Sequence, residues 1–150
     1  MKIAVASDHA GFPLKSRIIA ELQQEGHEVT DLGTNSTDPV DYPDYARAVA
    51  ESILSRRVER AVLVCGSGAG ACVAANKFRG IRAATCHDSF SARQCVGDDD
   101  VNVLCLGARV IGPELAVDVV RDYAGARFSG AERHRRRLEK IAGFEAAFGK

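Results

Sequence analysis

Short apolar runs recur along the chain, separated by stretches whose apolar residues return at every third or fourth position. A short apolar run bounded by polar residues favours a strand, and the wider spacing favours an amphipathic helix. Some of the runs are apolar almost throughout, which is typical of strands covered by helices on both faces of a sheet. The pattern predicts strands at residues 2–7, 27–32, 60–65, 81–86 and 101–106.

Helical periodicity fills the intervals between these runs. It predicts helices at about 12–25, 43–57, 69–78, 88–96 and 113–124, and a last helix from about 131. Where strands and helices alternate, right-handed crossovers lay the strands parallel in one sheet. The sequence therefore predicts an α/β fold: a three-layer α/β/α sandwich, Rossmann-like, with a five-stranded parallel sheet and a C-terminal helix. Because we find no linker and no internal repeat, we expect residues 1–150 to form a single domain.

Composition and charge exclude several classes of protein. The chain has 150 residues, with 20 basic and 20 acidic side chains, so its net charge does not draw it to nucleic acid or to an anionic membrane. No apolar run approaches the roughly 20 residues of a membrane-spanning helix, and the opening MKIAVASDHAG becomes polar too soon for a secretion signal. The five cysteines form no C-x-x-C pair. An odd number of cysteines in a chain with a large core indicates reduced thiols and a cytoplasmic protein.

Reactive residues gather next to the predicted strands, and in a parallel sheet ligands bind at the carboxyl ends of the strands. SDHAG follows the first strand, CGSGAGA the third and HDSF the fourth, while GDDD precedes the fifth. In CGSGAGA, Gly66, Gly68 and Gly70 let the backbone turn tightly and approach a ligand. The helix that follows directs its amide groups at anionic oxygens. The G-x-G-x-G spacing is one residue short of the dinucleotide pattern and lies on the third strand, which disfavours a dinucleotide site.

Cys65 stands where the third strand runs into this glycine loop. A cysteine at a strand end is more often packing than chemistry, and we interpret the other four cysteines in that way. Cys65 differs because it faces a helix N-terminus, the setting in which a thiolate is favoured. A thiolate acts as a nucleophile or as a general base. Ser67 could hydrogen-bond a substrate hydroxyl, or it could merely cap the helix.

A basic segment, ERHRRRLEKI, opens the last predicted helix. Arg133 and Arg137 are one turn apart and share a face, which suits two guanidinium groups that clamp a phosphate. No aromatic platform accompanies the arginines, so a nucleic-acid site is the weaker interpretation. An apolar stripe continues along the same helix, formed by Leu138, Ile141, Phe144 and Phe148.

Five motifs together carry a resemblance to a known family. SDHAGFPLK, DYPDYA, CGSGAGACVAANKFRGIRAATCHD, NVLCLGARVIG and RHRRRLEKI resemble the ribose-5-phosphate isomerase B family, in the same order and without evident insertion. That family also includes galactose-6-phosphate and allose-6-phosphate isomerases, and the resemblance runs from Met1 to about Ile141. It implies an aldose–ketose isomerase that works through a cis-enediolate without a metal or another cofactor. It also implies a homodimer, or a dimer of dimers, whose active sites are shared between two chains.

The resemblance implies catalytic roles for the residues that match the family pattern. Cys65 matches the base that moves a proton between C1 and C2 of the sugar. The backbone amides from Gly66 through Gly68 and Ala69 to Gly70 would stabilise the enediolate oxyanion, as fixed donors do. The groups that handle O1 and O2 of the sugar, and pass protons between them, match Asp8 and Ser67.

Binding roles follow from the same resemblance. His9, Arg133 and Arg137 match ligands of the substrate phosphate. Arg109 matches a phosphate ligand that the neighbouring subunit donates, and Tyr42 matches a residue that lines the sugar pocket. The implied partners are therefore a phosphorylated sugar and a second copy of the chain, with no nucleic acid and no membrane.

One segment departs from the family pattern. Members with the catalytic cysteine commonly carry His-Asn before the fifth strand, where the histidine opens the furanose ring, and this chain carries Asp98 and Asp99 there. Other members use a histidine on the last helix, which is His134 here. We therefore expect His134 to open the ring, with Asp98 as the alternative. Because Asp99 replaces an amide that would contact sugar hydroxyls, the substrate could be another aldose phosphate: galactose 6-phosphate, allose 6-phosphate or an unusual pentose or tetrose phosphate.

Two further interpretations belong to other classes of function. The chain could be a sugar-phosphate-binding module without turnover, although binding alone would not need a thiolate at Cys65. It could also be a metal enzyme that uses the acids at 98–100, but adjacent acids seldom converge on one ion without further ligands. The ordinary interpretation of that triplet is a solvated turn ahead of the fifth strand. For His87 and Asp88, which follow the fourth strand, two interpretations stay open: a functional role, or simple capping of the next helix.

Overall fold

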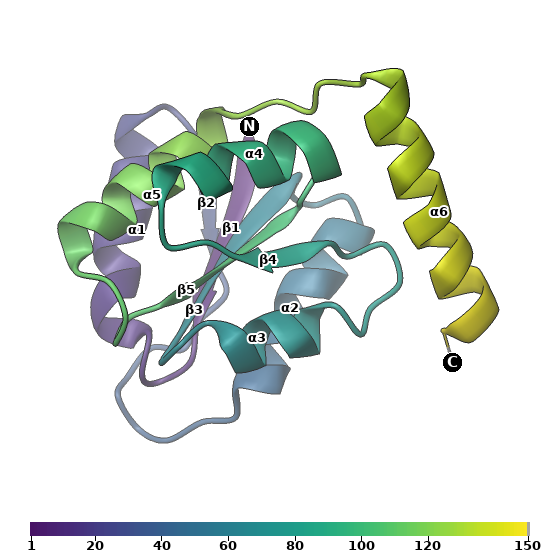
Figure 1. The fold of residues 1–150 in the computed structure, drawn as a ribbon. Coiled ribbons are helices and arrows are strands. Elements are labelled where there is room, and N and C mark those ends of the chain that lie inside the picture. Colours follow the sequence, from purple (N-terminus) through teal and green to yellow (C-terminus); the bar gives the residue numbers. More distant parts are fainter. Residues whose placement is uncertain (150) are drawn as a thin grey trace.

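The computed structural model describes residues 1–149, in which a parallel sheet lies between two layers of helices (Figure 1). Its five strands lie in the order β2-β1-β3-β5-β4, and every neighbouring pair is parallel. The α/β/α sandwich predicted from the sequence is confirmed. The strands are β1 (Lys2–Ser7), β2 (Glu28–Asp31), β3 (Arg60–Cys65), β4 (Ala83–Thr85) and β5 (Val103–Gly107).

Helices cover both faces of the sheet (Figure 1). Within residues 1–149 they are α1 (Phe12–Gln24), α2 (Tyr42–Leu54), α3 (Ala69–Ala75), α4 (Ser89–Asp99), α5 (Pro113–Gly125) and α6 (Glu132–Phe148). One face packs against α1, α4 and α5, and the other packs against α2 and α3. Proline stands in the first turn of α1, α2 and α5, where the missing amide hydrogen has no helical partner to lose.

Alternate residues of the central strands face opposite helix layers. On β1, Ile3 and Val5 pack with α1 and α5, whereas Ala4 and Ala6 pack with α2. All four side chains are fully buried. Burial on both faces is the reason that β1, β3 and β5 read in the sequence as nearly unbroken apolar runs.

Several boundaries differ from the prediction: α2 ends at Leu54 and not at residue 57, and others concern β4 and the helices beside it. The apolar pattern predicts a strand at 81–86, whereas β4 spans only Ala83–Thr85. Side chains form hydrogen bonds with main-chain groups at the start of this strand. The main-chain N–H of Arg82 donates to Asn102 Oδ1 at 2.8 Å. The side-chain amide of Asn76 donates to the Ala83 carbonyl and accepts the Ala83 N–H. Asn76 is also the residue that directly follows α3, which ends at Ala75 and not at about residue 78 as predicted. In contrast, α4 continues to Asp99, beyond the predicted end at about residue 96, so Asp98 and Asp99 lie on a helix and Asp100 follows it.

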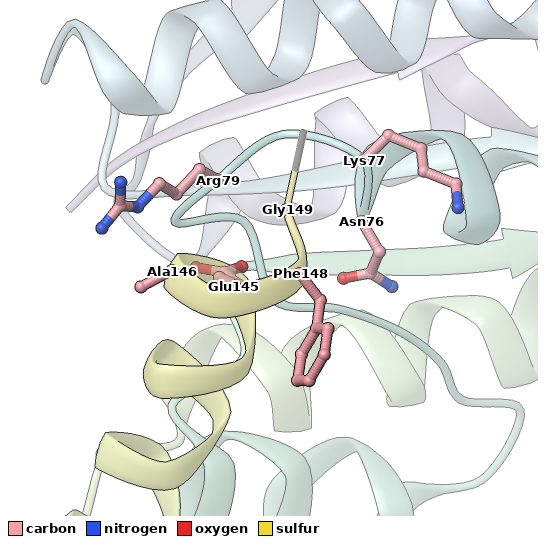
Figure 2. A pocket seen from close by; sticks show the side chains of 7 residues that line it. All are labelled: Asn76, Lys77, Arg79, Glu145, Ala146, Phe148 and Gly149. Carbon is pink, nitrogen blue, oxygen red and sulfur yellow. The ribbon is translucent and has the colours of Figure 1, made fainter.

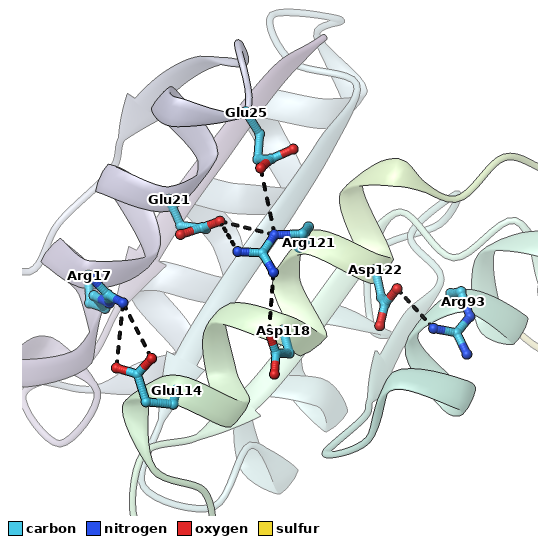
Figure 3. A network of polar contacts seen from close by, with 8 residues as sticks. All are labelled: Arg17, Glu21, Glu25, Arg93, Glu114, Asp118, Arg121 and Asp122. Atoms are coloured by element: carbon cyan, nitrogen blue, oxygen red, sulfur yellow. Dashed lines mark hydrogen bonds and ion pairs between the residues drawn. The ribbon is translucent and has the colours of Figure 1, made fainter.

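Ion pairs join the helices on one face of the sheet (Figure 3). Arg121 of α5 lies 2.5 Å from Glu21 of α1 and 3.2 Å from Asp118 of its own helix. Arg93 of α4 pairs with Asp122 of α5 at 2.9 Å. Because Glu21 is buried, its charge needs this guanidinium partner. The pairs hold α5 between α1 and α4, in addition to the apolar packing beneath them.

Lys15 of α1 fixes the loop that leads from β2 to α2. Its Nζ lies 2.7 Å from Asp31 Oδ1 and donates to the Thr34 carbonyl at 2.6 Å. The lysine is almost fully buried, so its charge depends on these oxygens for compensation. The loop continues to Val40 and Tyr42, which contact the residues of the candidate site described below.

Replacement of Lys15 by methionine is expected to lower the free energy of unfolding by about 2 kcal/mol, since a charge-assisted hydrogen bond to the Thr34 carbonyl is lost. Urea unfolding followed by circular dichroism measures the change. Lys2→Met is the matched control, because Lys2 is exposed and lies 3.8 Å from an exposed Glu28. That control is expected to shift the free energy by less than about 0.5 kcal/mol. Equal losses in the two variants would contradict the anchoring role of Lys15.

The last helix, α6, stands apart from the sandwich (Figure 1). It contacts α4, and His134 is the residue that it buries. Three of its large apolar residues are exposed, whereas Leu138 is half-buried: Ile141 is 42% exposed, Phe144 61% and Phe148 81%. Contiguous exposed apolar side chains of this size are typical of a surface that meets a partner. None of the helices among residues 1–149 combines the length and the apolar composition needed to cross a bilayer.

Candidate active site

A cavity of about 500 Å³ opens at the carboxyl edge of the sheet. Three neighbouring strands converge on it, because Asp8 follows β1, Cys65 ends β3 and Arg109 follows β5. This edge is where a parallel α/β sheet binds its ligands. The structure therefore brings together most of the residues that the sequence singles out. The cavity is lined by Asp8, His9, Ala10, Tyr42, Cys65, Gly66, Ser67, Gly70, Arg109 and Val110.

The Cys65 thiol lines this cavity and is nearly buried, with 5% of the residue exposed. The N–H of Gly68 donates a hydrogen bond to its Sγ at 3.1 Å. A main-chain donor aimed at the sulfur fixes its position and compensates a negative charge on it. A nearly dry sulfur with such a donor, placed beside a cavity, suits a general base.

The glycines of the loop meet strict geometric demands. Gly68 has φ +84°, in the left-handed region that side chains disfavour, and this turn carries the chain from β3 into α3. Gly107, at the end of β5, packs directly against the backbone of this loop at Ser67. A Cβ on Gly107 would lie 2.6 Å from the carbonyl carbon and oxygen of Ser67. The backbones of these two segments are therefore in direct contact, and a shift of one displaces the other.

Hydrogen bonds orient the two polar residues that follow β1. Asp8 is buried, and its Oδ1 accepts the Gly11 N–H at 2.9 Å. The Nδ1 of His9 accepts the Val40 N–H at 3.2 Å. Because Nδ1 is an acceptor in this contact, the neutral ring carries its proton on Nε2. His9 can thus offer an N–H to a ligand in the cavity.

Arg109 and Tyr42 also line the cavity. The main-chain N–H of Arg109 donates to the Gly66 carbonyl at 3.0 Å, and its guanidinium lies beside the same glycine. Tyr42 covers Gly70 so closely that a Cβ there would lie 2.9 Å from the ring. The resemblance implies that Arg109 is donated to a neighbouring subunit. In the structure it lines the cavity of its own chain.

Five other predicted residues lie elsewhere in the chain. Asp98 and Asp99 form the last turn of α4, near the amino end of β4, where Arg82 Nε donates to the Asp99 carbonyl at 3.2 Å. The cavity at Cys65 lies at the carboxyl ends of the strands, so the sheet separates the two sets of residues. The remaining three belong to the first turns of α6: Arg133, His134 and Arg137.

His134 is enclosed between two polar partners. Its Nδ1 lies 2.7 Å from Ser129 Oγ, and its Nε2 lies 3.6 Å from Asp98 Oδ1. Only 4% of the histidine side chain is exposed, compared with 35% of the Asp98 side chain. The two alternatives for ring opening are therefore neighbours in the fold, and the aspartate is the more accessible of the pair.

The acids that could have formed a metal site make separate contacts. Asp100 lies 2.6 Å from a guanidinium nitrogen of Arg82, whereas Asp98 lies beside His134. Within residues 1–149, no group of three or more His, Cys, Asp or Glu residues is placed to hold a metal ion. The neighbouring Asp88 caps α4, accepting the Ser91 N–H at 2.8 Å, and this bond lowers the pKa of the carboxyl group.

Cys72 is a second thiol close to the loop, and sequence reasoning assigned it to packing. It lies one turn into α3 and is half-buried. A hydrogen bond with the Cys105 thiol, helped by Thr85 and Asn76, lowers the pKa of Cys72 to about 6. Spacing along the chain could not reveal this, because Cys105 is distant in sequence. Any test of Cys65 as the base needs Cys72 as its control.

A larger cavity, of about 690 Å³, lies where the end of α6 meets the loop after α3 (Figure 2). Lys77, Arg79, Glu145 and Phe148 are among its lining residues, and the Gly80 N–H donates to Glu145 at 3.3 Å. The described residues that line it include neither a thiol nor an imidazole. We therefore assign the chemistry to the smaller cavity at Cys65.

Comparison with known proteins decides the family. The model of the family described as Ribose/Galactose Isomerase matches residues 3–141. The chain belongs to the ribose/galactose isomerase family. Ribose-5-phosphate isomerase B of Escherichia coli K12 is 45% identical over 144 residues, which cover 96% of each protein. D-erythrulose-4-phosphate isomerase of Pectobacterium atrosepticum is 42% identical over 147 residues, which cover 97% of this chain and 95% of that protein.

The fold of this ribose/galactose isomerase agrees with the sequence relationship. The structure of Clostridium thermocellum ribose-5-phosphate isomerase B aligns with a TM-score of 0.95 and 44% identity over 99% of both chains. The family inferred from the five motifs is thereby confirmed. The chain is a sugar-phosphate isomerase, an enzyme that interconverts an aldose and a ketose. Its cavity offers what such a ligand needs: cationic and N–H donors at Arg109 and His9, and polar groups for sugar hydroxyls at Asp8 and Ser67.

Proposed function

We propose that this isomerase interconverts ribose 5-phosphate and ribulose 5-phosphate, with Cys65 as the base that moves the proton between C1 and C2. The observation that carries the proposal is the Cys65 sulfur, which lines the cavity and accepts the Gly68 N–H at 3.1 Å. The family relationship and the 45% identity to a ribose-5-phosphate isomerase B support the choice of substrate.

The proposed reaction starts from the open-chain aldose. The Cys65 thiolate takes the proton from C2, the C1–C2 double bond forms, and negative charge collects on O1. Main-chain amides of the loop from Gly66 to Gly70 stabilise this cis-enediolate. The thiol then returns the proton to C1, while Asp8 and Ser67 pass the O2 proton to O1. The product is the ketose, and the enzyme regains its thiolate.

We further propose that two chains share each active site in a homodimer, which could itself pair into a tetramer. Arg133 and Arg137 are exposed on α6, which contacts α4 and contributes no residue to the lining of the Cys65 cavity of its own chain. The exposed apolar stripe on the same helix supports a second chain as its cover. In this arrangement the arginines of one subunit and His9 of the other bind the phosphate, with Arg109 at the entrance. Asp99 would contact sugar hydroxyls from the partner's side.

Ring opening is assigned to the pair formed by Asp98 and His134. The sequence favours His134 as the group that reaches the sugar. Its burial, with ring nitrogens facing Ser129 and Asp98, instead supports Asp98 as the group that exchanges the proton with the substrate. His134 then holds the carboxyl group in place from behind.

A tetrose phosphate is the second candidate substrate. The 42% identity to D-erythrulose-4-phosphate isomerase supports it, as does the Asp98–Asp99 pair in place of the family's His-Asn. The proton transfer at Cys65 is the same for both substrates.

An assay of the purified protein in the presence of EDTA tests the substrate. Ribose 5-phosphate is expected to turn over faster than D-erythrulose 4-phosphate, galactose 6-phosphate and allose 6-phosphate, with kcat/KM highest by at least about tenfold, in the range that one sugar carbon can provide. A higher kcat/KM for D-erythrulose 4-phosphate would replace the first proposal by the second. Loss of turnover in EDTA would contradict a reaction that needs no metal.

The thiol chemistry also bears on the compartment. All five cysteines are free, with Cys65, Cys86 and Cys105 buried. A catalytic thiolate needs reducing surroundings to stay active. We therefore propose a cytoplasmic enzyme.

A further inference from the structure

His87 lies in one row with Gly107 and Cys65 across the carboxyl edge of the sheet. Pairing of β4 with β5 ends at Thr85, which faces Cys105. Beyond that point the chain leaves the sheet, and the His87 side chain takes the next place: its Nε2 accepts the Gly107 N–H at 2.9 Å. On its other side, Gly107 pairs with Cys65 of β3. The His87 imidazole thus accepts a hydrogen bond from Gly107 where β4 no longer pairs with β5, and Gly107 pairs on its other side with Cys65, the candidate base.

Gly107 contacts two parts of the candidate site: the turn that carries Arg109 and the backbone of Ser67. Its carbonyl accepts the Val110 N–H at 2.9 Å, which closes the turn that carries Arg109. Its Cα faces the Ser67 backbone with no room for a side chain. A displacement of Gly107 therefore moves the Arg109 guanidinium and the Ser67 hydroxyl together.

We infer that His87 is a positioning residue for the isomerase reaction, which fixes Gly107 and through it Ser67 and Arg109. The contact needs a neutral imidazole whose proton is on Nδ1, because an Nε2–H could not accept the amide. Thr85, the last residue of β4, also contacts the glycine loop that contains Ser67, because its Oγ1 donates to the Gly68 carbonyl at 3.3 Å. The inference rests on the proposed function, because it assigns roles to Ser67 and Arg109.

Two substitutions separate the hydrogen bond from the bulk of the ring. His87→Gln retains an acceptor at a similar distance from the backbone, whereas His87→Leu fills the space without one. In His87→Leu, kcat is expected to fall about tenfold or more and KM to rise about fivefold, because small displacements of catalytic groups have large effects on rate. His87→Gln is expected to stay within about threefold of the wild type in both constants.

The two kinetic constants distinguish positioning from a simple loss of folded enzyme. Partial unfolding lowers the apparent kcat and leaves KM unchanged, whereas displacement of Arg109 raises KM. Wild-type constants in His87→Leu would overturn the inference. So would equal losses in His87→Leu and His87→Gln, since the acceptor would then be irrelevant.

Amide hydrogen exchange tests the contact independently of turnover. Gly107 N–H is expected to exchange at least about tenfold faster in His87→Leu than in the wild type and His87→Gln, while the Ile3 amide in β1 is unchanged. If no sugar phosphate is turned over by the wild type, the proposed function fails. The exchange rates still show whether His87 protects the Gly107 N–H. Unchanged protection of Gly107 in His87→Leu would overturn the inference.

Discussion

Cys65→Ala is expected to lower kcat for the interconversion of ribose 5-phosphate and ribulose 5-phosphate by about a thousandfold, which is the contribution of a well-placed general base. KM is expected to stay within about threefold, because the proposed phosphate ligands, His9 and the arginines, are untouched. The cavity and the loop remain, since the side chain removed is small and lies at a strand end. Steady-state kinetics of the purified variant, in EDTA and beside the wild type, measure both constants.

Cys72→Ala is the matched control for this substitution. Both cysteines flank the glycine loop, and it is Cys72 whose pKa is lowered, to about 6, by the Cys105 thiol. Yet Cys72 lies on α3 outside the residues that line the cavity, whereas Cys65 lines it. Cys72→Ala is therefore expected to keep kcat within about threefold. A large loss in Cys72→Ala, with Cys65→Ala active, would show that the base is the other thiol.

The half of the site on the carboxyl edge could be predicted because topology alone determines it. Parallel strands end at one edge of their sheet, so residues that directly follow strands meet there, whatever the details of packing. Asp8, Cys65 and Arg109 follow β1, β3 and β5, which are adjacent in the sheet. Strand and helix periodicity was sufficient to identify Asp8 and Cys65, whereas Arg109 was identified through the family resemblance.

The remaining residues could not be placed by the same reasoning. The position of α6 depends on how it packs on α4, and its periodicity does not reveal which neighbour it meets. His134 is consequently buried beside Asp98, although the basic sequence around it indicates an exposed face. The inferred role of His87 depends on the register between β4 and β5. The side chain can accept the Gly107 N–H because β4 ends at Thr85 and leaves that N–H without a strand partner.

Two inactive variants are expected to restore activity when they share a dimer. Cys65→Ala lacks the proposed base, and the double variant Arg133→Ala/Arg137→Ala lacks the proposed phosphate ligands on α6. If each site takes Cys65 from one subunit and the arginines from the other, a mixed dimer has one site with both defects and one site with none. Co-expression with two different affinity tags, followed by tandem purification, isolates this mixed dimer. Its activity is expected to be about half that of the wild-type dimer, since one of two symmetric sites is intact.

This recovery depends on how the functional groups are divided between the subunits. If Cys65 and the arginines of the same chain formed one site, every site of the mixed dimer would carry a defect, and activity would stay at the level of the two parents. A mixture of the separately purified parents, assayed before any exchange of subunits, gives that level directly. Light scattering of the wild type provides the remaining control, because a monomer in solution would contradict shared sites. Restored activity would explain why the chain carries Arg133 and Arg137 on an exposed helix that does not line the cavity of its own Cys65.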